Sequence, residues 1–143
     1  MDEKVQKDLK GIISLIESKL ISTGLNYKEG NFRECISALY FAYEGLIRYI
    51  LVLKEYYPES QEGIEVLKHF VDEGEISKKT YNNFTELYLR RKDADYHGFL
   101  SFDKNTVDEY LQLFSQSFSE MKDSFKKEHF DKINNAGKFF LEL

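Results

Sequence analysis

The sequence predicts an all-α protein, an up-and-down bundle of four to five helices with short connections. Apolar residues recur with helical spacing along almost the whole chain, and no segment shows the apolar–polar alternation of a half-buried strand. The 143 residues include one proline and eight glycines, too few for a loop-rich sandwich. No linker divides the chain. We therefore expect one bundle over residues 1–128 and a C-terminal tail over residues 129–143.

The first predicted helix has a single apolar stripe, which defines its buried face. The stripe consists of Val5, Leu9, Ile12, Ile13, Ile16 and Leu20. Gly24 and the polar run at residues 26–30 are expected to end this helix. Asn31, with Glu34 three positions later, predicts the N-cap of the next helix in a capping-box-like arrangement.

The second predicted helix, residues 32–54, is apolar around most of its circumference. Such a helix needs cover on more than one side, so it is either central in the bundle or also meets a second subunit. Its most apolar stretch, residues 38–53, contains Glu44 and Arg48, which can pair at a spacing of four. A short stretch with two charges indicates a buried helix and not a membrane span.

Three further segments have helical patterns. Residues 61–72 predict a short helix, and Ser77 is a candidate cap for a longer helix that reaches Tyr96. Asn105 is expected to open the next helix. The apolar stripe of that helix consists of Val107, Tyr110, Leu111, Phe114, Phe118, Met121 and Phe125. The tail at residues 129–143 is expected to be either a short packed helix or an extension.

The composition of the chain limits the kinds of ligand that the protein is expected to bind and the compartment in which we expect it to work. The formal charge of −5 disfavours a general attraction to nucleic acid or anionic membrane, so any such contact needs a locally basic groove. The single cysteine, Cys35, cannot form an internal disulfide, and we expect it to be a buried, inert thiol. The first ten residues lack the apolar core of a signal peptide. We expect a cytoplasmic protein with no membrane association.

Several familiar chemical signals are missing from the sequence. It has no glycine-rich phosphate loop and no Cys-x-x-Cys pair. The three histidines, His69, His97 and His129, lack metal-ligand spacing. We therefore expect neither a metal site nor a cofactor.

One charged stretch, residues 90–97, stands out at the end of the predicted fourth helix. Arg90 and His97 are seven residues apart and return to nearly the same face, with Asp93 between them. Arg91 and Asp95 are four apart on an adjacent face that continues the apolar stripe of the earlier turns. Charged side chains that point at an interior or an interface must form ion pairs or serve a binding or catalytic function, because an unpaired buried charge is costly. A merely solvated helix end is the alternative interpretation.

At these residues the sequence resembles a known family. The string Arg91-x-x-Ala94-Asp95-Tyr96 followed by His97 resembles the signature of HEPN domains, whose ribonuclease members carry Arg-x(4–6)-His. Both Arg90 and Arg91 have that spacing to His97. The segment at residues 38–43, Ala-Leu-Tyr-Phe-Ala-Tyr, resembles the aromatic segment of a small stand-alone prokaryotic branch of this family. The resemblance covers roughly residues 9–125.

The resemblance implies a compact helical bundle that works as a metal-independent endoribonuclease, a toxin or a defence component. His97 would be the general acid or base, and Arg91, with Arg90, would hold the scissile phosphate. Asp95 would orient Arg91, and Tyr96 would line the groove or stack on a base. The resemblance also implies a homodimer in which two motifs face one cleft.

Two other functions stay open at this point. Lys92 follows Arg91, where catalytic members often have Asn, Asp or His. The chain could instead be a non-catalytic module that binds a nucleotide, or that pairs with a nucleotidyltransferase antitoxin. Arg91 and Asp95 would then form a structural ion pair. A scaffold without a nucleotide ligand is the third alternative.

Overall fold

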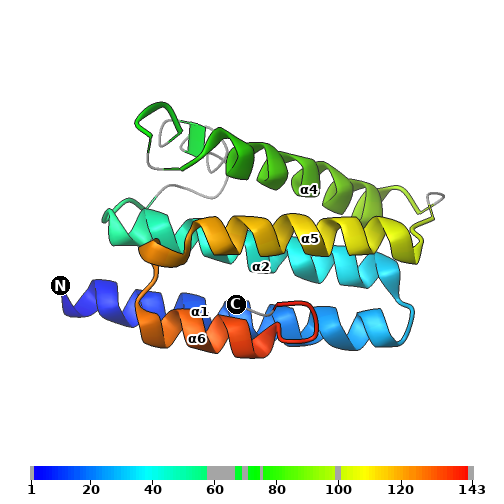
Figure 1. Cartoon of the computed structure of the whole chain (residues 1–143), viewed down its shortest axis with the longest axis horizontal. Helices are drawn as coiled ribbons and strands as arrows, with labels where there is room; N and C mark the ends of the chain where they lie inside the picture. The colour runs from blue at the N-terminus through cyan, green and yellow to red at the C-terminus, as the bar shows by residue number, and fades with distance from the viewer. Residues whose placement is uncertain (1, 58–66, 69–70, 75, 99–100, 142–143) are drawn as a thin grey trace.

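The computed structural model describes residues 2–57, 67–68, 71–74, 76–98 and 101–141. These residues form five α-helices and one short 3-10 helix, and no strand occurs among them. Successive helices run up and down in three tiers, with α4 on one side, α2 and α5 in the middle, and α1 with α6 on the other (Figure 1). The predicted all-α bundle is confirmed.

The helices α1 (Glu3–Lys28) and α2 (Phe32–Leu53) form a long antiparallel pair. Every member of the predicted α1 stripe is buried. The helix ends at Lys28, within the polar run at residues 26–30 as predicted, but Gly24 takes no part in ending it, because it lies inside the helix. Gly24 instead makes room for the ring of Phe139, which would lie 3.2 Å from a Cβ atom at this position. The left-handed turn residue is Gly30, with a φ of 75°.

Asn31 is the N-cap of α2, as predicted, but its side chain makes no capping hydrogen bond. The side-chain amide of Asn31 instead donates a hydrogen bond to a carboxylate oxygen of Glu29, with 3.3 Å between the nitrogen and the oxygen. The expected capping box is therefore not formed. The predicted ion pair between Arg48 and Glu44 is present at 3.2 Å.

The central place of α2 explains its apolar circumference. It packs against α1, α4 and α5, and these three neighbours cover most of its surface. By length and composition alone α2 could cross a membrane, but 72% of its apolar window is buried inside the bundle. Burial in the core thus accounts for the composition of α2 without a second subunit.

The helix α4 (Lys78–Tyr96) begins as predicted, with the side chain of Ser77 accepting from the backbone amide of Thr80 at 3.0 Å. The helix α5 (Lys104–Glu120) starts earlier than predicted. Its N-cap is Asp103, whose carboxylate accepts from the amide of Thr106. A carboxylate at this position also interacts favourably with the helix dipole, which explains why Asp103 and not Asn105 begins the helix.

Most of the short helix predicted at residues 61–72 lies outside the described residues. At the other end of the chain, the 3-10 helix η1 (Lys122–Ser124) leads into α6 (Lys127–Ala136). The boundary expected between residues 128 and 129 therefore falls inside α6. His129, Phe130 and Ile133 are buried, and α6 packs along α1. The first part of the predicted tail thus belongs to the core.

Candidate functional site

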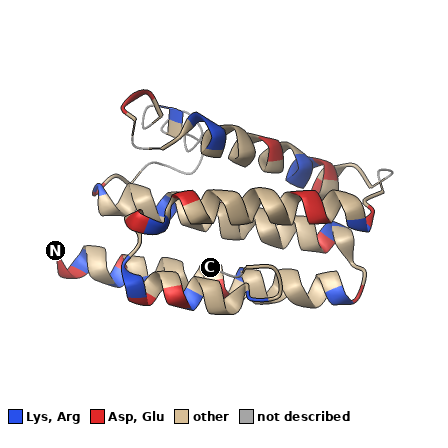
Figure 2. Ribbon diagram, viewed as in Figure 1, with Lys and Arg blue, Asp and Glu red and all other residues tan. Residues whose placement is uncertain are grey.

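The charged stretch at residues 90–97 forms the last two turns of α4, in the outer tier of the bundle (Figure 1). His97 is the C-cap, and its backbone amide donates to the carbonyl oxygen of Asp93 at 3.1 Å. Figure 2 shows basic and acidic residues close together along α4. The end of α4 is therefore a densely charged part of the surface.

One face of this turn joins Arg90, Asp93 and His97. The Nη1 atom of Arg90 lies 3.4 Å from one oxygen of Asp93, and the Nε2 atom of His97 lies 4.0 Å from the other. The side chains of Arg90 and His97 are 45% and 49% exposed. The predicted shared face is present, and a single carboxylate lies between the guanidinium and the imidazole.

Arg90 is also tied to α5. Its Nε atom donates to the phenolic oxygen of Tyr110 at 2.6 Å, and that hydroxyl donates to Glu86 at 3.4 Å. The hydrogen bond to Tyr110 raises the pKa of Arg90 further above its already basic value. Arg90 is thus a fixed positive charge whose direction is set by a neighbouring helix.

The adjacent face holds Arg91 and Asp95. The Nε atom of Arg91 is buried and lies 2.9 Å from a carboxylate oxygen of Asp95, as the spacing of four predicted. This contact is an ion pair and not an aligned hydrogen bond, because Nε has no hydrogen-bond partner among the described residues. The side chain of Arg91 is 21% exposed, the lower exposure of the two arginines.

Aromatic rings surround the guanidinium of Arg91. Its central carbon lies 5.4 Å from the ring centre of Tyr40, 5.2 Å from that of Phe41 and 5.8 Å from that of Tyr96. These are cation–π distances. Tyr40 and Phe41 come from the segment at residues 38–43, so the two parts of the sequence resemblance, far apart in the chain, contact each other here. The aromatic segment of α2 holds the arginine of α4.

Arg33, which sequence reasoning missed, caps the end of α4 from the start of α2. Its Nη1 donates to the carbonyl oxygens of Ala94 at 2.6 Å, His97 at 3.3 Å and Asp93 at 3.4 Å. Its Nη2 donates to Gly98 at 3.5 Å. The carbonyl of Asp93 also accepts from the backbone amide of His97, whereas the carbonyl of Ala94 is one of the last in the helix, which the helix cannot satisfy itself. A basic residue in the first turn of α2, where the helix dipole favours acids, is the one signal that could have drawn attention to Arg33.

An open groove of about 580 Å³ runs beside this end of α4. Asp95 and Arg33 line it, and Lys19 of α1 contributes a second cation. The ring of Phe41 lies between two positive charges, with the Lys19 ammonium 5.2 Å and the Arg91 guanidinium 5.2 Å from its centre. The groove thus borders the Arg91 face of the motif, and His97 is not among its lining residues.

The other polar candidates lie elsewhere. Within the described residues, no group of three or more His, Cys, Asp or Glu side chains is arranged to hold a metal ion. His129 is buried beside Tyr49, with 2.8 Å between the phenolic oxygen and Nδ1, and His69 lies outside the described residues. Burial raises the pKa of Cys35 to about 12, so this thiol is protonated at neutral pH. The prediction of a buried thiol is confirmed.

Comparison with known protein families gives one match. A family model described as HEPN domain matches residues 17–129. The matched region begins within α1 and includes all of α2, α4 and α5, and with them the stretch at residues 90–97. No curated protein sequence matches the chain.

Proposed function

Because this chain belongs to the HEPN domain family, we propose that it is a metal-independent endoribonuclease that acts in the cytoplasm as a toxin or defence component. The family includes ribonuclease toxins as well as nucleotide-binding modules. One observation favours a ribonuclease over a nucleotide-binding module. The carboxylate of Asp93 lies between Arg90 and a half-exposed His97 at the end of α4, an arrangement that provides a cation and an imidazole on one accessible face.

The proposed reaction is a transesterification within the RNA chain. The 2′-oxygen attacks the adjacent phosphorus, the bond from phosphorus to the 5′-oxygen breaks, and the products are a 2′,3′-cyclic phosphate and a 5′-hydroxyl. His97 either takes the proton of the 2′-hydroxyl or supplies a proton to the leaving 5′-oxygen. Water carries out whichever of these two proton transfers His97 does not. Histidine suits either task, because its imidazole can both accept and donate a proton.

The two arginines take different parts in this proposal. Arg90 lies on the His97 face, so it would stabilise the negative charge that builds up on the scissile phosphate. Arg91, oriented by Asp95 at the edge of the groove, would bind a neighbouring phosphate of the RNA. Tyr96 is 69% exposed and offers its ring for stacking on a base.

A homodimer is part of the proposal. Besides Tyr96, α4 exposes 52% of Leu89, so its outer surface carries large apolar groups as well as the charged site. A second copy packed on this surface would bring a second His97 to the same RNA. One imidazole could then act as the base and the other as the acid, because a single half-exposed His97 cannot do both at once.

The test is an RNA cleavage assay in EDTA with the intact protein. We expect cleavage to survive chelation and to fall at least about 100-fold in His97→Ala and Arg90→Ala. We expect a comparable fall for Arg91→Ala. Arg48→Ala is the matched control, because Arg48 is a half-exposed arginine whose ion pair is with Glu44 and not with the acids of the motif. Cleavage that needs a divalent metal, or that persists in His97→Ala, would contradict the proposal.

One observation favours a second function, a non-catalytic nucleotide-binding or partner module that acts with a nucleotidyltransferase antitoxin. Arg91 is paired with Asp95 and enclosed by aromatic rings, as a structural arginine would be. For this function we expect intact RNA with every variant. Saturable binding of a nucleotide, or of a nucleotidyltransferase, would accompany it.

A further inference from the structure

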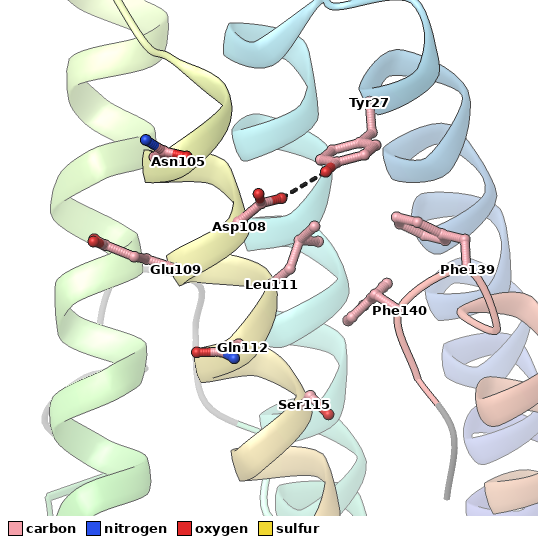
Figure 3. A pocket seen from close by; sticks show the side chains of 9 residues that line it. All are labelled: Tyr27, Asn105, Asp108, Glu109, Leu111, Gln112, Ser115, Phe139 and Phe140. Atoms are coloured by element: carbon pink, nitrogen blue, oxygen red, sulfur yellow. Dashed lines mark hydrogen bonds between the residues drawn. The ribbon is translucent and has the colours of Figure 1, made fainter.

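A second groove lies at the same end of the bundle but on a different face, between α5 and the segment that follows α6 (Figure 3). Its volume is about 620 Å³. One side is aromatic and consists of Tyr27, Phe139 and Phe140. On the α5 side Asp108 faces Tyr27, whereas the side chain of Glu109 points away from the rings. The ribonuclease proposal uses none of these residues.

The aromatic side is built by packing and not by chance exposure. The ring centres of Tyr27 and Phe139 are 6.0 Å apart, and those of Phe139 and Phe140 are 4.6 Å apart. Gly24 lets Phe139 lie directly on α1, since any Cβ there would meet the ring at 3.2 Å. Phe140 packs edge-on against the buried ring of Phe114. The three rings are therefore held in place while remaining accessible from the groove.

The acidic side carries a stable negative charge. Asp108 accepts a hydrogen bond from the hydroxyl of Tyr27 at 2.6 Å and one from the ammonium of Lys104 at 3.0 Å. The hydrogen bond from Tyr27 and that from Lys104 lower the pKa of Asp108, so it is ionised at neutral pH. Glu109, the next residue along α5, is exposed at the rim.

An ammonium group of the protein itself lies near both Asp108 and the ring of Tyr27, although its residue, Lys104, does not line the groove. The Nζ atom of Lys104 lies 5.5 Å from the ring centre of Tyr27 while it contacts Asp108. The position of Lys104 shows that a positively charged amine can lie near the ring of Tyr27 and contact the carboxylate of Asp108 at the same time. Because its side chain is largely exposed, this internal ammonium can be displaced by one that also contacts Phe139 and Phe140.

We propose that the groove formed by Tyr27, Asp108, Phe139 and Phe140 binds a small quaternary ammonium ion. Ring faces attract organic cations, and a nearby carboxylate adds a complementary charge. A quaternary ammonium suits the site because it makes apolar contacts with the rings and needs no hydrogen-bond acceptor. The proposal is independent of the ribonuclease function, since it concerns a different face and different residues.

The test is a titration of the full chain with choline, followed through the aromatic resonances of the groove by NMR. The matched control ligand is dimethylbutanol, which has the shape of choline without its charge. We expect choline to shift the resonances of Tyr27, Phe139 and Phe140 to saturation, and the neutral analogue to bind at least about tenfold more weakly. Equal binding of the two ligands would overturn the proposal.

Two variants separate the site from a general loss of structure. Asp108→Asn keeps the shape of the side chain and is expected to weaken choline binding about tenfold. Lys104→Gln removes the internal competitor and is expected to tighten binding, an effect that misfolding cannot imitate. Asp123→Asn, which changes an exposed acid in η1, is the control and should change nothing. Unchanged affinity in Asp108→Asn, or weaker binding in a folded Lys104→Gln, would overturn the proposal.

Discussion

Arg33, in the first turn of α2, donates a 2.6 Å hydrogen bond to the carbonyl oxygen of Ala94 in the last turn of α4. The two residues are 61 positions apart in the chain. The same guanidinium also donates hydrogen bonds to the carbonyl oxygens of Asp93 and His97. Its central carbon, Cζ, lies 5.3 Å from the ring centre of Phe102. The backbone that carries His97 is therefore held from outside its own helix.

We predict that Arg33→Ala destabilises the protein by about 2 kcal/mol, because several carbonyls at the end of α4 lose a charged donor. Arg33→Lys should recover only part of this loss, since an ammonium cannot reproduce the planar fork. Urea denaturation measures both effects. Arg48→Ala is the control and should cost no more than about 0.5 kcal/mol, as an exposed pair does. If the two alanine variants were equally stable, the capping role of Arg33 would be wrong.

Two helical glycines should respond to alanine with opposite signs. In Gly45→Ala the new Cβ would lie 2.5 Å from Cγ1 of Ile16, so either the Ile16 side chain or the two helices must shift, and we expect a loss of about 1–3 kcal/mol. In Gly11→Ala the new Cβ meets nothing within 4 Å, and we expect a gain of up to about 1 kcal/mol. Thermal denaturation of both variants checks the prediction, and a shift of the same sign in both would contradict it.

The stability of the bundle should fall on mild acidification because of His129. Burial lowers the pKa of this histidine below its ordinary value of 6.5, so the unfolded chain binds the proton more readily than the folded one. The free energy of unfolding should therefore decrease as the pH falls through about 6.5, with a slope of at most about 1.4 kcal/mol per pH unit from this group. His129→Gln keeps a polar partner for Tyr49 and should reduce the slope.

That comparison is made by urea denaturation between pH 5 and pH 8, in wild type and His129→Gln. His97 is present in both proteins, so any contribution from it cancels in the difference. Identical slopes for the two proteins would show that the proton on His129 does not control this part of the pH dependence.

Glu120 should stabilise the contact between α4 and α5 only while it is ionised. Its carboxylate accepts hydrogen bonds from the hydroxyls of Thr80 at 2.7 Å and Ser77 at 2.8 Å, and these bonds lower its pKa. The stabilisation is present above the unfolded pKa of 4.5 and is lost as the pH falls through the lower folded value. We expect Glu120→Gln to cost about 1 kcal/mol or less at neutral pH, because the carboxylate is partly in solvent.

Denaturation at pH 7 and near pH 3 measures this effect, with the difference between Glu120→Gln and wild type expected to shrink in acid. Glu3→Gln, in the first turn of α1, offers a comparison with an acid outside the contact. A loss of stability in Glu120→Gln that is the same at both values of pH would contradict a role for the charge.

The sequence alone determined the relationships within each helix. The stripe of α1 and the part of the predicted stripe that lies in α5 are buried as predicted, because apolar side chains at helical spacing necessarily share one face. Met121 and Phe125, which the prediction placed on the same stripe, are buried too but follow the end of α5. For the same reason the pairing of Arg91 with Asp95, and the placement of Asp93 between Arg90 and His97, follow from spacing alone. The family resemblance agreed with the matched family model because it rested on such local patterns.

Only the tertiary structure decided how residues of different helices meet. The cap that Arg33 places on α4, the rings of Tyr40 and Phe41 around Arg91, and the contact of Gly24 with Phe139 each join distant parts of the chain. Helical periodicity defines the faces of one helix but not how that helix is rotated and shifted against its neighbours. Those offsets come from the packing of the whole core, in which each side chain fills the space that the others leave.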